Sequence, residues 1–125
     1  RGPGFNSPNQ FGYSLRELAP HDAQCATPQD IEKVLVNVEE LATLVASADL
    51  ILLDGGPRRI FAAITSKFAN PSAIIVVDNT DEPEIYGNFD CFPDQHYLRI
   101  PFSGLVPLNP NGWESTVFMP RTYVA

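Results

Sequence analysis

Two hydrophobic runs decide the fold: Asp49-Leu50-Ile51-Leu52-Leu53-Asp54-Gly55-Gly56 and Ala73-Ile74-Ile75-Val76-Val77-Asp78-Asn79. Each run contains four or more consecutive apolar residues without polar alternation, which is typical of a strand buried on both faces. The segment between them, residues 57–69, has the apolar spacing of a helix. We therefore predict strand, helix and strand, with two parallel strands that each end in a carboxylate.

A helix start lies upstream of these runs, at residues 27–30, where Thr, Pro and Asp stand in favourable positions. Apolar residues then recur at helical spacing as far as Ser47. We predict one helix over residues 28–47. The alternative is a short strand at 34–38 followed by a helix from Glu39.

Two further strands are predicted downstream, at residues 97–102 and 115–119, joined by a long hairpin-like loop over 103–113. Before them, residues 81–84 open a further helix whose apolar positions are Ile85, Phe89 and Phe92.

The chain has 125 residues, of which 44% are hydrophobic, so it suffices for one domain with a core. Residues 1–26 are rich in Gly, Pro, Asn and Ser, and we expect an irregular N-terminal arm before a single α/β domain over 27–125. Cys25 and Cys91 show no metal-binding spacing and are interpreted as two unrelated thiols.

The net charge of the chain limits the classes of partner that it is expected to bind. Fifteen acidic and eight basic residues give a net charge of −7, which opposes binding to nucleic acid and to anionic membranes. No apolar run approaches the ~20 residues of a membrane span, and the first residues do not have the pattern of a signal peptide. We expect a cytoplasmic protein that binds neither nucleic acid nor membrane.

This order of elements resembles the C-terminal half of class I S-adenosylmethionine-dependent methyltransferases, over residues 48–121. The runs ending at Asp54 and Asn79 resemble the family's fourth and fifth strands, and the two later strands resemble its closing antiparallel pair. Residues 102–107 and 113–116 resemble the tail of bacterial members of the group. The resemblance implies a small, partial Rossmann-like sheet with two parallel strands, an antiparallel closing pair and helices packed on the sheet.

The chain departs from the family at the cofactor site. The family's glycine-rich loop and its ribose-binding acidic residue belong upstream of the matched part. Residues 1–48 contain no strand followed by such a loop, and they are too few for the missing strands and helices. S-adenosylmethionine binding by this chain alone is therefore not expected, and no catalytic residue is assigned.

A magnesium site is implied by a narrower resemblance, to metal-dependent O-methyltransferases with carboxylates at these strand ends. The implied ligands are Asp54, Asp78 and Asn79, and oxygen donors suit Mg²⁺. The alternative, which we favour, is structural: an Asp after a strand can cap the next helix or accept turn N–H groups.

Three further residues are candidates for ligand contact. Arg58 and Arg59 open the predicted helix, where the helix dipole disfavours positive charge. They could hold an anionic ligand, although pairing with surface carboxylates is the commoner role. Trp113 could line a pocket or cover the sheet edge. His21 and His96 lack any ligand spacing and are expected at the surface.

Two functional hypotheses remain. The first is a non-catalytic binding or interaction protein on a truncated methyltransferase-like fold. The second is an O-methyltransferase-related enzyme whose cofactor site is completed by dimerisation or by a further N-terminal part. Residues 50–53 would form a bare hydrophobic sheet edge. Either the helix over 28–47 and the arm cover this edge or a second copy pairs there, and we predict the homodimer.

Overall fold

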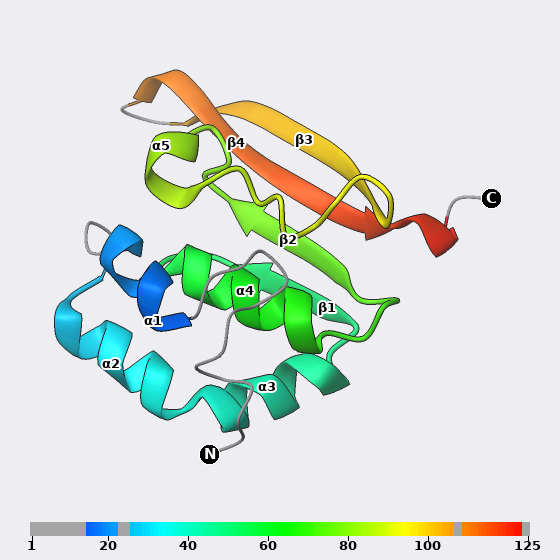
Figure 1. Ribbon diagram of the computed structural model, residues 1–125. Coiled ribbons are helices and arrows are strands. Elements are labelled where there is room, and N and C mark those ends of the chain that lie inside the picture. The colour runs from blue at the N-terminus through cyan, green and yellow to red at the C-terminus, as the bar shows by residue number, and fades with distance from the viewer. Residues whose placement is uncertain (1–14, 23–25, 107–108, 124–125) are drawn as a thin grey trace.

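The computed structural model describes residues 15–22, 26–106 and 109–123, without the side chains of 105–111. In the described part the chain is an α/β structure with one mixed sheet (Figure 1). The elements are α1 (Leu15–Leu18), a 3₁₀ turn η1 (Ala19–Asp22), α2 (Pro28–Val36), α3 (Val38–Ser47), β1 (Leu50–Leu53), α4 (Arg58–Phe68), β2 (Ile74–Asp78), α5 (Pro83–Tyr86), β3 (Tyr97–Val106), β4 (Asn109–Pro120) and a 3₁₀ turn η2 (Arg121–Tyr123).

The sheet has the strand order β1-β2-β4-β3. β1 and β2 are parallel, with Leu50 opposite Ile74. β4 runs antiparallel to β2, with Val76 opposite Val117, and β3 runs antiparallel to β4 on the outside. The predicted α/β class, the parallel pair and the antiparallel closing pair are therefore confirmed. Pairing of two copies at the edge strand β1 stays a prediction.

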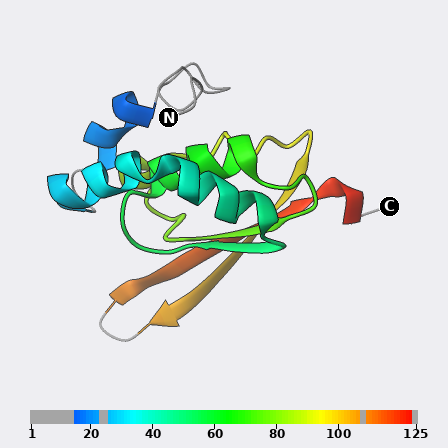
Figure 2. The same ribbon diagram turned by 90° about the horizontal axis from the view of Figure 1, so that it is seen from below.

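The helices lie on one side of the sheet (Figure 2). One hydrophobic cluster joins the inner face of the sheet to Ala62 of α4 and to the segment after α5. A second cluster joins α2 and α3 to the opposite side of α4, around Leu35, Val38 and Ile64. Within the described residues, no helix is long and apolar enough to cross a bilayer.

The segment 28–47 is helical but is not one helix. It divides at Asn37 into α2 and α3, so the predicted single helix is wrong at this residue, and the strand alternative is wrong throughout. The Asn37 side chain donates to the carbonyl of Lys33 at 2.7 Å, and its backbone N–H is shared between the carbonyls of Lys33 and Val34. An Asn side chain that bonds its own backbone competes with the helical pattern, which explains the break.

The predicted helix through residues 85–92 is much shorter in the structure. α5 ends at Tyr86 because Gly87 follows with φ = 83°, a backbone conformation that ends a helix. Phe89 and Phe92 instead lie in a loop and are 5% and 3% exposed. Their rings pack against Phe118 of β4, at centroid distances of 6.3 and 4.9 Å. Burial of the two rings from a loop replaces the expected amphipathic helix.

The predicted loop over 103–113 is mostly strand. Pairing continues beyond the predicted ends, with Ser103 opposite Glu114 and Gly104 opposite Trp113. The ladder reaches Val106 and Asn109 with one irregularity, and residues 107–108 lie outside the described residues. The turn residues in this segment therefore sit within a long hairpin, whose pairing with a neighbouring strand overrides their local preference.

The prediction that β1 and β2 are buried on both faces is wrong for the described structure. Ile75 and Val77 have no exposed surface, whereas Leu50 and Leu52 are 64% and 63% exposed. Alternate residues of a strand face opposite sides, and helices cover only one side here. The apolar residues on the other side are therefore left in contact with solvent.

Candidate functional site

The carboxyl ends of β1 and β2 bring together the three predicted metal ligands. Asp54 follows β1, Asp78 ends β2 and Asn79 follows it. Because Leu53 pairs with Val77, Asp54 and Asp78 lie at neighbouring strand ends. Because ligands of open α/β sheets bind beyond the carboxyl ends of the strands, this edge is the candidate site.

Asp78 is the best-connected carboxylate of the site. Its Oδ1 accepts hydrogen bonds from Ser115 Oγ at 2.7 Å, from Trp113 Nε1 at 2.9 Å and from the backbone N–H of Asn79 at 2.9 Å. Burial raises the pKa of Asp78, but these hydrogen bonds outweigh burial, so the pKa lies below its ordinary value. The carboxylate is thus ionised at neutral pH and ties β2 to β4.

Arg58 is the central cation of the site and is only 4% exposed. Its Nη2 donates to Asn79 Oδ1 at 2.9 Å and lies 3.6 Å from Asp54 Oδ1. The guanidinium also stacks over the ring of Tyr86, 4.2 Å from the centroid. Asn79 has φ = 59°, a conformation that Asn tolerates better than most residues. The sequence favoured pairing of Arg58 with surface carboxylates, and the carboxylate beside it is the exposed Asp54, although the Arg58 side chain itself is buried.

The magnesium site stays a prediction. The three predicted ligands do approach one another, but the guanidinium of Arg58 already bonds the amide oxygen of Asn79. A divalent ion at the same oxygens would lie beside a buried positive charge, which is an unfavourable Coulomb interaction. Among residues 15–22, 26–106 and 109–123, no group of three or more His, Cys, Asp or Glu is arranged to hold a metal.

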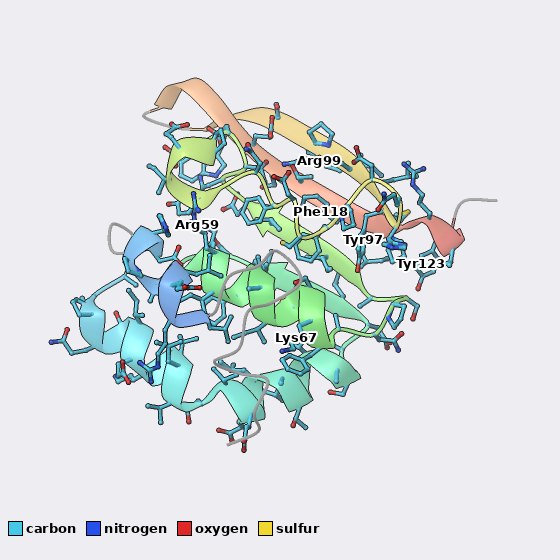
Figure 3. The ribbon with its side chains drawn as sticks, viewed as in Figure 1. Arg59, Lys67, Tyr97, Arg99, Phe118 and Tyr123 are labelled. Atoms are coloured by element: carbon cyan, nitrogen blue, oxygen red, sulfur yellow. The ribbon has the colours of Figure 1, made fainter. Side chains whose placement is uncertain are left out.

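Arg59 faces a different part of the molecule from Arg58. It lines a cavity of about 360 Å³ between α4, the end of α1 and the segment after α5, as the labelled side chain in Figure 3 shows. Leu18, Ala62 and Phe89 supply apolar walls, and Asp90 adds a carboxylate. The structure therefore separates the two arginines that the sequence placed side by side.

Asp22 is a buried carboxylate at the start of α4 that the sequence did not indicate. It has no exposed surface, and its Oδ1 accepts from the backbone N–H of Arg59 at 3.3 Å. The backbone N–H of Ile60 makes a weaker contact with the same carboxyl group and also lowers its pKa. α4 has no capping bond from its own N-cap residue, Pro57, so Asp22 caps it from 37 residues away. Burial raises the pKa of Asp22 despite these bonds.

Asp22→Asn should change how stability depends on pH. Because its pKa is raised in the folded state, the folded protein binds this proton more tightly than the unfolded chain. The wild type should therefore lose stability relative to the variant as pH rises from the unfolded value near 3.8 through the folded pKa, with no further change above it. Urea unfolding of both proteins across this range measures the difference.

Asp22→Ala is the matched control, because it removes the cap as well as the charge. It should cost about 0.5–2 kcal/mol relative to Asp22→Asn across this pH range. A wild type that gains stability relative to Asp22→Asn as pH rises through that window would contradict the assignment.

The other predicted roles of residues at the strand ends have mixed outcomes. Asp54 does not cap α4 and is exposed, whereas Asp78 accepts the turn N–H of Asn79 as predicted. Trp113 is 39% exposed and lies against Asp78 at one end of the sheet.

The histidines His21 and His96 are exposed, as expected. Cys91 is buried with its thiol pKa raised to about 12 by burial, and Cys25 lies outside the described residues.

No protein-family model, no curated protein and no solved structure matches this chain. The candidate site therefore rests on its own geometry. It contains one buried cation, two carboxylates and two aromatic rings at the carboxyl edge of a parallel strand pair, and most of its polar atoms bond one another.

Proposed function

We propose that this chain is a non-catalytic binding or interaction protein, built on part of a methyltransferase-like fold. The observation that carries the proposal is the outer face of the sheet, which is apolar and which no described element covers. Exposed apolar patches of this kind mark interaction sites in folded proteins. The proposal includes the predicted homodimer through the edge strand β1.

The polar cluster supports a structural role for the candidate site. Asp78 Oδ1 accepts three hydrogen bonds, and Asn79 Oδ1 is taken by Arg58. A general base or a metal ligand needs an oxygen that a substrate proton or an ion can reach. In this structure, Asp78 Oδ1 and Asn79 Oδ1 are bonded to side chains of β4 and α4, so they link β2 to these two elements.

The second candidate is an S-adenosylmethionine-dependent O-methyltransferase-related enzyme, completed by a second copy or by a further N-terminal part. The observation that favours it is the exposed carboxylate of Asp54. Asp54 stands at the edge of the sheet where α/β proteins bind ligands. Arg58 contacts both Asp54 and the ring of Tyr86.

Calorimetric titration of S-adenosylmethionine and S-adenosylhomocysteine distinguishes the two candidates. We expect no heat of binding at millimolar ligand, with or without Mg²⁺, because none of the strands in the described residues is followed by a G-x-G-x-G sequence. Micromolar binding that is lost in Asp54→Asn would favour the enzyme and would contradict the interaction proposal.

A further inference from the structure

The outer face of the sheet is apolar from β1 to β3. Fully buried Ile75, Val77 and Phe118 fix which residues face the helices, and the strand register then assigns the alternate residues to the outer side. These alternate residues are named here the open face. Its apolar side chains are Leu50, Leu52, Ile74, Val76, Leu98, Ile100, Phe102, Trp113, Val117 and Met119, and its other described positions are Asp78, Gly104 and Ser115.

Charge is confined to one end of the open face. The only ionisable side chain among its strand positions in the described residues is Asp78, at the carboxyl end of β2. The exposed Asp54 follows the neighbouring strand end and lies 3.6 Å from Arg58, so the two carboxylates and this one cation leave this end with a net negative charge. An apolar surface with an acidic end calls for a partner that has an apolar stripe and a basic end.

The width of the open face is close to that of a helix. On the central strands β2 and β4, Ile74, Val76 and Val117 are short and half-buried, although β4 also carries Met119 and the 39% exposed Trp113. Leu52 on β1 and Phe102 on β3, at the two sides, are 63% and 60% exposed. Three strand spacings of about 4.8 Å separate β1 from β3, roughly 14 Å in total. An α-helix is about 10–12 Å across with its side chains.

The parallel pair gives a second reason to expect a helix. All-parallel sheets occur almost only where helices cover both faces, and strands of such sheets are apolar on both faces. β1 and β2 have that sequence pattern, yet α4 covers only their inner side. A second copy is a poorer occupant of this face, because its own open face has the same acidic end and supplies no basic end.

We infer that the open face binds one amphipathic α-helix of a partner protein. Its apolar stripe lies along Ile74, Val76 and Val117, and its basic residues lie beside Asp54 and Asp78. This inference rests on the proposed interaction function and names the class of partner.

The probe is a synthetic helical peptide of about 20 residues, which spans about 30 Å. It carries Leu at i, i+3, i+4 and i+7 positions and Lys elsewhere, with extra Lys at one end. One control peptide has the same composition with the stripe scrambled, and another replaces Lys by Glu. We expect calorimetric binding with a dissociation constant on the order of 10 μM, a gain of helical circular dichroism, and at least about tenfold weaker binding of both controls.

Two leucines of equal exposure provide the matched protein variants. Leu52 on the open face is 63% exposed, and Leu44 on α3 is 62% exposed. Leu52→Asp should weaken peptide binding at least about tenfold, whereas Leu44→Asp should leave it unchanged. Leu52→Gln is the milder variant if circular dichroism shows that Leu52→Asp is unfolded, and it should weaken binding in the same direction.

The outcomes separate this inference from the proposed function. Equal binding of the scrambled or the Glu peptide, or equal effects of the two leucine variants, would overturn the helix assignment. Light scattering that shows a dimer dissolved by Leu52→Asp, without peptide binding, would also overturn it but would leave an interaction function. If the chain neither binds the peptide nor self-associates, both the helix assignment and the proposed interaction function are overturned.

Discussion

Phe118→Ala should lower the free energy of unfolding by about 3–5 kcal/mol, the range for removing a buried aromatic ring. Phe118 has no exposed surface and lies at the centre of the cluster between the sheet and the helices. Figure 3 shows it on β4, near Arg99, whose guanidinium lies 5.2 Å from the ring centroid. Its loss leaves a cavity and removes the packing partner of Phe89 and Phe92.

The control for this prediction is Phe102→Ala, which deletes the same ring from the open face. Because Phe102 is 60% exposed, we expect a loss below about 1 kcal/mol. Urea unfolding followed by circular dichroism measures both variants. Equal losses for Phe118→Ala and Phe102→Ala would contradict the assignment of an inner and an outer face.

Arg58→Met should lower the free energy of unfolding by about 1–3 kcal/mol. Methionine fills much of the space, but it leaves the buried amide oxygen of Asn79 without its donor, and an unsatisfied buried acceptor costs energy in this range. The stacking of Arg58 on Tyr86 is lost as well. Asp54 contributes less, because it is exposed and can be solvated.

A double-mutant cycle tests the cause of this loss. Asn79→Gly keeps the φ of 59° accessible while removing the amide group. If the Arg58 to Asn79 hydrogen bond carries the effect, the double variant should lose less stability than the sum of the two single variants. Additive losses would show that the two side chains act independently.

The strands were predictable because each is encoded in its own residues. The runs before Asp54 and Asp78 gave the parallel pair, and the alternation before Phe102 and Met119 gave the closing pair, with ends within a few residues except in the hairpin. The strand ends also brought Asp54, Asp78 and Asn79 to one edge, as the resemblance implied.

The failures have a common cause, which is contact between segments that are distant in sequence. Phe89 and Phe92 have helical spacing, but the ring of Phe118 holds them in a loop. Asp22 lies in a segment with no local signal and caps a helix 37 residues away. Arg58 is adjacent to Arg59, yet only Arg58 meets Asn79 and Tyr86. The spacing of residues within one helix or strand does not indicate which residues of other elements they contact.

The non-alternating runs of β1 and β2 remain informative even though their outer residues are exposed. A sequence that is apolar on both faces is suited to burial on both faces, and the described helices supply only the inner cover. In β1, Leu52 is 63% exposed and the adjacent Leu53 is 6% exposed, and this contrast between the two faces of one apolar strand is the strongest sign that the open face is a binding surface.

The most direct test is a methyl NMR spectrum of the chain with and without the Lys-bearing helical peptide. We predict that methyl resonances of Leu50, Leu52, Val76 and Val117 shift, because these side chains form the open face. Resonances of Ile75 and Val77, alternate residues on the inner side, should move little. Shifts confined to α2 and α3, or spread evenly over both faces of the sheet, would contradict a helix-binding open face.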